Sequence, residues 1–204
     1  MRALIYNTTV SSMTSSWYRE VLQRMPDNSR LLDIGVGTGE ALMKNEDLLR
    51  QRNLFVQGID IDKSYLQACQ KNIEKRGLSD VISVRHQSVY DLENSHEYDG
   101  VYFSSSFMLL PDQDTALDRA RDALKPSGTL FFTLTLFQKR SPFWEAVKPM
   151  LRWLTTIEFG KVTYEAEFLE LLKRHEIEVV ESSLLLDKDN RQMKLIATHP
   201  VSQS

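Results

Sequence analysis

Glycines and an acidic residue at the end of one apolar run form the segment of this sequence best suited to bind a charged ligand. The run Leu31–Ile34 contains Asp33 and leads into Gly35, Gly37 and Gly39. Glycine lets the chain turn sharply and lets a ligand press against the backbone. A carboxylate at Asp33 would repel phosphate groups and attract an ammonium group. The pattern therefore predicts a backbone cradle for a ligand that carries a positive charge.

A second acid, Asp60, ends the next apolar run, Leu54–Ile61. An acid about 20 residues after a glycine loop is placed to accept hydrogen bonds from both hydroxyls of a ribose. A dinucleotide-binding loop would need its third glycine at position 40, where Glu40 stands. A phosphate-binding P-loop is excluded because no Gly-Lys-Ser/Thr follows the glycines. The pattern thus predicts neither a dinucleotide-binding loop nor a P-loop.

The elements that position these acids follow from the alternation of apolar runs with stretches of helical spacing. Such alternation predicts a parallel sheet covered by helices on both faces, with ligands at the carboxyl ends of the strands. The expected strands are Leu31–Ile34, Leu54–Ile61, Val81–Val84, Gly100–Phe103, Thr129–Leu136, Ile177–Leu186 and Met193–Thr198. The expected helices carry Trp17, Val21, Leu22 and Met25; Tyr65, Leu66, Cys69 and Ile73, ending at Gly77; Ala116, Leu117, Ala120 and Leu124; and Tyr164, Phe168, Leu171 and Leu172.

Composition indicates one soluble domain. The chain has 204 residues, of which 42% are hydrophobic and 26% charged, and its formal net charge is −3. A negative balance argues against a dedicated nucleic-acid-binding protein, and we expect no DNA partner. The single cysteine excludes an internal disulfide and a multi-cysteine zinc site, and the four histidines share no metal-ligand spacing. We expect no metal site, no membrane span and a cytoplasmic protein.

Several motifs resemble those of the class I S-adenosylmethionine-dependent methyltransferases. The loop Asp33–Gly39 is similar to motif I of that family, and Asp60 stands at the matching distance. Tyr98–Ser104 looks like the fourth strand, Phe107–Asp112 like the segment after it, and Leu124–Leu130 like the turn into strand five. The resemblance implies an α/β fold: a three-layer Rossmann-like sandwich with a mostly parallel seven-stranded sheet whose last strand is antiparallel. It also implies a single domain 1–204, made of an N-terminal arm and helix 1–27, a cofactor-binding core 28–137, a lid insertion 138–163, and a closing helix and hairpin 164–204.

The resemblance implies S-adenosyl-L-methionine as the cofactor. The contacts that it implies are Asp33, Gly35, Val36, Gly37, Gly39, Asp60, Ile61, Ser88, Val89 and Ser104. Ser88 departs from the family, which usually carries there an acid that holds the adenine amino group. Ser88 would make an uncharged contact, and Asp91 could substitute only if the loop took a different path.

The expected reaction is in-line transfer of a methyl group, for which the cofactor supplies the reactivity, so we assign no catalytic residue. Nucleic-acid amino-methyltransferases of this fold carry Asn/Asp-Pro-Pro-Tyr/Phe after strand four, whereas this chain has Phe103–Ser106. We therefore expect a small-molecule acceptor. A protein or RNA acceptor, a non-catalytic binding module and an aminopropyltransferase remain alternatives. The expected acceptor contacts are Tyr18, Ser105, Met108, Trp144 and Trp153. Tyr18 and a helical lid that starts at Ser141-Pro142 would close over a floor at Ser104–Met108.

Overall fold

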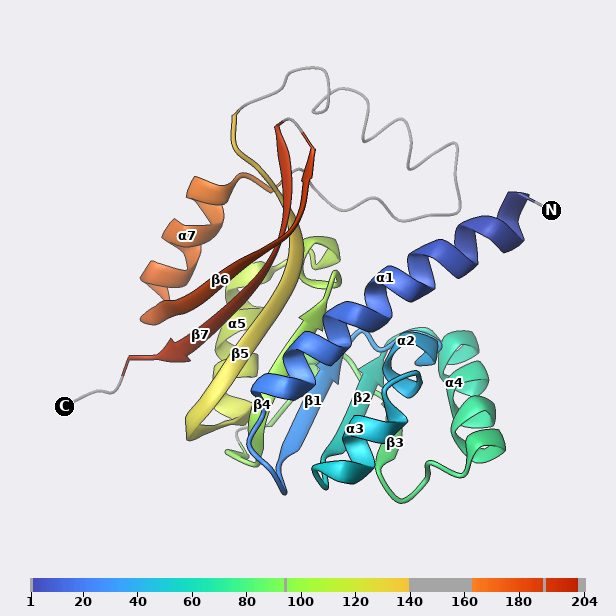
Figure 1. Cartoon of the computed structure of the whole chain (residues 1–204). Helices are drawn as coiled ribbons and strands as arrows, with labels where there is room; N and C mark the ends of the chain where they lie inside the picture. Colours follow the sequence, from blue (N-terminus) through green and yellow to red (C-terminus); the bar gives the residue numbers. More distant parts are fainter. Residues whose placement is uncertain (1, 94, 140–162, 189, 202–204) are drawn as a thin grey trace.

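The computed structural model describes residues 2–93, 95–139, 163–188 and 190–201, with the backbone alone for residues 2–12. Their strands form one seven-stranded sheet in the order β3-β2-β1-β4-β5-β7-β6 (Figure 1). Strands β1 to β5 run parallel, and β7 is antiparallel to both of its neighbours. The strands are β1 (Arg30–Ile34), β2 (Phe55–Asp60), β3 (Ile82–His86), β4 (Tyr98–Ser104), β5 (Leu124–Phe137), β6 (Ile177–Lys188) and β7 (Arg191–Pro200).

The predicted fold class is confirmed, because the described chain has the seven expected strands and an antiparallel last strand. Among the strands, the largest difference in bounds is at β5, which begins at Leu124 instead of Thr129, so Leu124 does not belong to the preceding helix as predicted. Leu124 pairs with Tyr98, and the register then shifts so that Thr129 pairs with Gly100. The Lys-Pro-Ser-Gly turn is thus an irregularity inside the strand pairing and not a loop before it.

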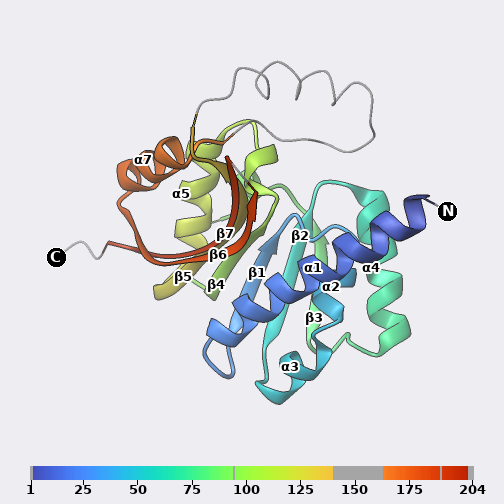
Figure 2. The same cartoon turned by 45° about the horizontal axis from the view of Figure 1, so that its top comes forward.

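Helices cover both faces of the sheet, as the alternating pattern predicted. Adjacent residues of a strand point to opposite faces, so Leu31 packs with one layer and Leu32 with the other. The first layer contains α1 (Arg2–Arg24), α2 (Glu40–Met43), α3 (Glu46–Gln51) and α4 (Lys63–Arg76). The second contains the short 3-10 helices η1 (Val89–Asp91) and η2 (Phe107–Leu109), with α5 (Gln113–Ala123) and α7 (Glu165–Arg174). Figure 2 shows α1 and α3 on one side of the sheet and α5 and α7 on the other.

Helix ends follow the expected local chemistry. The carboxylate of Asp62 accepts hydrogen bonds from the backbone N–H groups of Ser64 and Tyr65, which fixes the start of α4. Gly77 ends that helix with φ of 65°, as predicted. No helix among the described residues is both long and apolar enough to cross a membrane. The predicted lid helix, with Trp144 and Trp153, lies outside the described residues.

Strand order reverses beside β1. From β1 the chain proceeds through β2 and β3 in one direction and through β4 and β5 in the other. Loops that leave the carboxyl ends of β1 and β4 therefore diverge, and ligands of open α/β sheets bind in the crevice between them. Asp33 lies at this end of β1, and Ser104 at this end of β4.

Candidate functional site

The carboxyl of Asp33 is completely buried, and only one of its oxygens has a partner. Its Oδ2 accepts a hydrogen bond from the hydroxyl of Tyr18 at 2.7 Å, whereas Oδ1 has no partner. Burial raises the pKa of Asp33 to about 7, the hydroxyl of Tyr18 acts in the opposite direction, and the charge of Asp60 raises the pKa further. The free chain therefore holds a carboxyl poised to ionise beside a positive group.

Tyr18 lies in the core and not on a solvent-facing lid surface. Its side chain is 3% exposed, and its ring meets the ring of Tyr102 edge to face, with centroids 5.1 Å apart. The hydroxyl of Tyr102 in turn pairs with Oγ1 of Thr133 at 2.8 Å. The sequence placed Tyr18 near the site, but its pairing with Asp33 depends on how α1 crosses the sheet. The acceptor contact predicted for Tyr18 stays a prediction.

The glycine loop is tied to the end of β2 by its backbone. The N–H groups of Gly35 and Val36 both donate to the carbonyl of Ile59, at 2.8 and 3.2 Å. Val36 is buried against Gly58, where a Cβ would lie 2.8 Å from the valine side chain. These contacts fix the loop between β1 and β2 and leave its outer backbone for a ligand.

The three loop glycines have different surroundings, although all have positive φ, at 83°, 58° and 67°. A Cβ on Gly35 would lie 2.7 Å from Cβ of Ser106, and one on Gly39 would lie 2.6 Å from Sγ of Cys69. A Cβ on Gly37 would meet no atom within 4 Å. Gly35 and Gly39 are thus required by packing of the protein itself, whereas Gly37 faces open space.

Asp60 holds the loop from the other side. Its Oδ2 accepts from the N–H of Gly37 at 2.9 Å, and its Oδ1 accepts from the N–H of Asp62, also at 2.9 Å. An ionised carboxylate can accept about four hydrogen bonds, so both oxygens keep capacity for further donors. The adjacent Ile61 is 72% exposed, which leaves an apolar surface beside the acid.

The segment after β3 contains a residue that the sequence reading missed. The amide of Gln87 donates through Nε2 to the carbonyl of Asp91 at 3.0 Å, while its buried Oε1 has no partner. The hydroxyl of the predicted contact Ser88 accepts from the N–H of Tyr90 at 3.3 Å and caps η1, whose first residue is the buried Val89. No motif pointed to Gln87; its position directly before Ser88 is the only sequence signal.

Three serines follow one another at the end of β4. Ser104 ends the strand, and Ser105 has a left-handed backbone, with φ of 57°, and a buried Oγ without a partner. The hydroxyl of Ser106 donates to the carbonyl of Ile34, which joins this segment to the end of β1. Met108, on η2, is partly buried against the core. The structure therefore places Ser104 and Ser105 on the same sheet edge as the glycine loop.

Buried side-chain oxygens without a partner mark this edge. Among the described residues they are Asp33 Oδ1, Gln87 Oε1 and Ser105 Oγ. Each residue lies at or directly after the carboxyl end of a parallel strand, β1, β3 and β4 respectively. An unsatisfied buried polar atom costs about 1–3 kcal/mol, and such atoms usually have a functional reason. All three therefore lie along the same edge of the sheet, at the carboxyl ends of its parallel strands.

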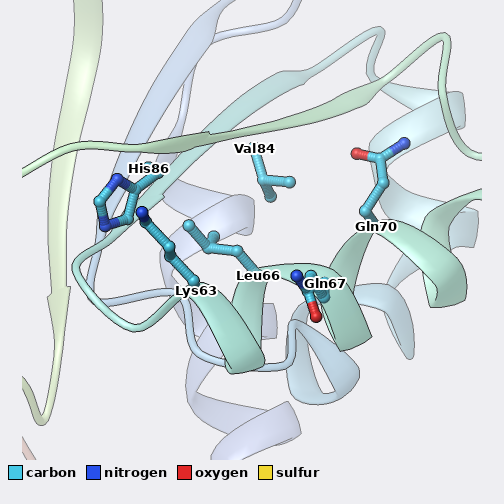
Figure 3. A pocket seen from close by; sticks show the side chains of 6 residues that line it. All are labelled: Lys63, Leu66, Gln67, Gln70, Val84 and His86. Atoms are coloured by element: carbon cyan, nitrogen blue, oxygen red, sulfur yellow. The ribbon is translucent and has the colours of Figure 1, made fainter.

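A separate hollow of about 330 Å³ lies at the outer edge of the sheet, between α4 and β3. Figure 3 shows Lys63 and His86 at one end of it and Gln70 at the other. The His86 ring bonds through Nε2 to the carbonyl of Ile61 at 3.1 Å. No residue of the glycine loop lines this hollow. Among the described residues, no group of three or more His, Cys, Asp or Glu is arranged to hold a metal ion.

Comparison with known proteins gives a consistent family. Residues 31–128 match the family model described as "Methyltransferase domain". The tRNA1(Val) (adenine(37)-N6)-methyltransferase of Vibrio vulnificus (strain YJ016) is 29% identical over 126 residues, which cover 53% of this chain and 52% of that protein. The chain spans about half the length of these curated relatives.

Solved structures show the same fold over nearly the whole chain. A geranyl diphosphate C-methyltransferase from Streptomyces coelicolor A3(2), in complex with Mg²⁺, geranyl diphosphate and S-adenosyl-L-homocysteine, aligns with a TM-score of 0.74 at 13% identity. The alignment covers 92% of this chain and 79% of that one. The [4+2]-cyclase SpnF aligns with a TM-score of 0.76 at 15% identity, with 92% and 82% covered. Identities this low establish the fold alone.

Proposed function

We propose that this chain is a class I S-adenosylmethionine-dependent methyltransferase, as the match of residues 31–128 to the methyltransferase domain supports, and that it binds S-adenosyl-L-methionine at the glycine loop and transfers the methyl group to a small-molecule acceptor. The observation that carries the proposal is the row of unpartnered buried oxygens along the ends of β1, β3 and β4. The free oxygens of Asp33 and Gln87 accept hydrogen bonds, so a ligand that fits them brings donors, and a positive charge beside Asp33, to this edge; the hydroxyl of Ser105 can donate or accept.

The donor set of this ligand fits the residues present. The unpartnered oxygen of Asp33 would receive the ammonium group of the cofactor. Asp60 would accept the ribose hydroxyls with the capacity left after its two backbone bonds. The unpartnered oxygen of Gln87 would take the adenine amino group, beside Ser88 and Val89, and Ile61 would cover the base. When bound, the cofactor supplies an electrophilic methyl group on a sulfonium centre.

The acceptor would lie against the ends of β4 and β5. Ser104, Ser105 and Met108 line that side, and we propose them, with Tyr18, Trp144 and Trp153, as acceptor contacts. The unpartnered hydroxyl of Ser105 can hold a polar group of the acceptor and so orient it for in-line attack. The segment Phe103–Ser106 lacks the Pro-Pro-aromatic sequence expected of nucleic-acid amino-methyltransferases, which favours a small molecule over RNA.

A second candidate function is favoured by one comparison. A fold neighbour named as a [4+2]-cyclase shows that this architecture is not confined to proteins named as methyltransferases. A chain that binds the cofactor and transfers no methyl group is therefore the alternative that the experiment must separate.

Binding and turnover test the proposal separately. A ligand that binds only the folded chain stabilises it by about 2.7 kcal/mol at a hundredfold excess over Kd. We expect S-adenosylhomocysteine to raise the melting temperature and NAD to leave it unchanged; the reverse result would overturn the cofactor assignment. Incubation with isotope-labelled S-adenosylmethionine and either a metabolite extract or total RNA, read by mass spectrometry, then identifies the acceptor class. Binding without any labelled product would support the non-catalytic alternative.

A further inference from the structure

We propose that Tyr18 is a positioning residue: its hydroxyl holds one oxygen of Asp33 so that the other oxygen faces the ammonium group of the cofactor. The inference rests on the proposed function, because it concerns the same ligand. This role of the hydroxyl is separate from the acceptor contact proposed above for Tyr18. It makes α1, which lies outside the residues matched to the methyltransferase domain, part of the cofactor site.

The geometry restricts the carboxyl from one side. The hydroxyl of Tyr18 donates to Oδ2 of Asp33 at 2.7 Å, and both side chains are buried. A carboxylate is planar, so fixing one oxygen fixes the direction of the other. Oδ1 is the oxygen without a partner. Removal of the hydroxyl would free the carboxyl to turn and would leave both oxygens without a donor.

The ring of Tyr18 is itself held in place. It meets the ring of Tyr102 at an angle of 87°, and it belongs to the same buried cluster as Val21, Leu22 and Met25 of its own helix. The hydroxyl therefore arrives at Asp33 already oriented. Ordering costs little entropy here, because the core has immobilised the side chain before any ligand binds.

Asp33 has few other sources of charge stabilisation. Groups that face it from the neighbouring elements are Tyr18 of α1, Tyr102 of β4, Asp60 of β2 and Cys69 of α4. Burial and Asp60 oppose ionisation of Asp33, and of these groups the hydroxyl of Tyr18 is the one that lowers its pKa. The ionised form that attracts an ammonium group therefore depends on Tyr18 until the ligand arrives.

The test compares Tyr18→Phe with the matched control Tyr102→Phe, which removes a hydroxyl bonded to Thr133 and not to Asp33. Affinities are measured by calorimetry for S-adenosylhomocysteine and for 5′-methylthioadenosine, which has no amino-acid moiety. Because a hydrogen bond to a charged group contributes substantially to binding, Tyr18→Phe should weaken the affinity for S-adenosylhomocysteine about tenfold. The same change should leave 5′-methylthioadenosine within about twofold, a difference below the typical worth of one hydrogen bond. Tyr102→Phe should leave both affinities unchanged.

The pH profile gives a second readout. In the wild type, affinity for S-adenosylhomocysteine should rise as Asp33 ionises near neutral pH, and in Tyr18→Phe the rise should move to higher pH. Equal weakening of both ligands would show a purely structural role and overturn the inference, as would an unchanged affinity for S-adenosylhomocysteine. A wild-type chain that binds neither ligand would instead overturn the proposed function and, with it, this role.

A double variant keeps the test decisive if Tyr18→Phe folds poorly. Asp33→Asn removes the buried charge that would lose its partner, so Tyr18→Phe combined with Asp33→Asn should fold. If Tyr18 acts through the charge of Asp33, the double variant binds S-adenosylhomocysteine as well as Asp33→Asn alone. A further fivefold loss in the double variant would contradict the inference.

Discussion

The ends of β1 and β2 each carry an aspartate at the glycine loop, but the two acids differ in burial and in hydrogen-bond partners. Asp33 is fully buried, bonds one side-chain hydroxyl and has an oxygen without a partner. Asp60 is partly exposed, and each of its oxygens already accepts a backbone N–H. Asp33 lacks a hydrogen-bond donor that a ligand can supply, whereas Asp60 already uses part of its hydrogen-bonding capacity to hold the loop.

This difference indicates that two acids beside one glycine loop can contribute to ligand binding through different interactions. Asp33 stores a desolvation cost in the free protein, and a cation relieves that cost when it binds. Asp60 carries little desolvation cost because it is partly exposed, and it contributes by holding the backbone of Gly37 in place. Substitutions should therefore separate the two acids by their effects on stability and on affinity.

The largest expected effect is on the stability of Asp33→Asn. The pKa of Asp33 is raised from 3.8 to about 7 on folding, so the folded chain holds its proton more tightly than the unfolded chain. The contribution of Asp33 to stability is therefore greatest below pH 3.8, falls between pH 3.8 and 7, and is level above pH 7. At 1.36 kcal/mol for each pH unit, the fall is on the order of 4 kcal/mol.

Urea unfolding of wild type and Asp33→Asn from pH 4 to pH 8.5 checks this. The difference in unfolding free energy should move in favour of the variant as pH rises and should then level off. A difference that stays constant with pH would mean that Asp33 is ionised in the folded chain throughout. Affinity for S-adenosylhomocysteine should fall in the same variant, so the gain in stability comes with a loss of binding.

Asp60→Ala should act mainly on affinity. It removes the acceptor of the ribose hydroxyls and frees the N–H of Gly37, so cofactor binding should weaken by about 1.5–3 kcal/mol. Asp62→Ala is the matched control, because it removes the cap of α4 and leaves the ribose acceptor in place. Calorimetry should show a loss of affinity in the first variant only. Equal affinities in the two folded variants would place the ribose elsewhere.

The contrast extends to two glycines. Gly35→Ala places a Cβ 2.7 Å from Ser106 at a positive φ, so it should lower the unfolding free energy by about 2 kcal/mol or more. Gly37→Ala meets open space and should cost about 1 kcal/mol from backbone strain alone. Gly37→Ala should nevertheless weaken cofactor binding more than its stability predicts. Chemical denaturation with calorimetry on the same samples measures both; unchanged affinity in Gly37→Ala would remove that face of the loop from the site.

The smallest effects are expected after β3. Ser88→Ala removes the cap of η1 and should cost about 1 kcal/mol of stability, with little change in affinity. Ser88→Asp should keep the cap and bind the cofactor as well or better. Gln87→Leu should weaken binding by about 1 kcal/mol, because it removes the unpartnered acceptor. Titrations with S-adenosylhomocysteine rank these variants, and a tenfold loss in Ser88→Asp would show that the adenine does not approach this position.

Local patterns were sufficient to predict the fold and the loop. Strand runs, Gly77 at a helix end and the acids at the carboxyl ends of β1 and β2 depend on near neighbours in the chain, and the structure has them where the sequence placed them. The early start of β5 was not predicted, since a strand bound inside a Pro-Gly turn depends on its pairing with Tyr98.

The partners of the site side chains could not be read from the sequence. The bond between Tyr18 and Asp33 joins a helix to a strand across the core, and the unpartnered oxygen of Gln87 is defined by what surrounds it. Spacing along the chain carries no information on either. The same limit explains why Ser88, singled out by motif alignment, turns out to cap a short helix while its neighbour offers the free acceptor.

The proton on Asp33 has a thermodynamic consequence for the binding reaction. Because burial raises the pKa of Asp33 to about 7, part of the free chain still carries that proton at neutral pH. An ammonium group that arrives beside Asp33 favours the ionised carboxyl, so the proton leaves for solution as the complex forms. The heat of cofactor binding then contains the ionisation heat of the buffer, and titrations in phosphate and in Tris should give different enthalpies for the same affinity.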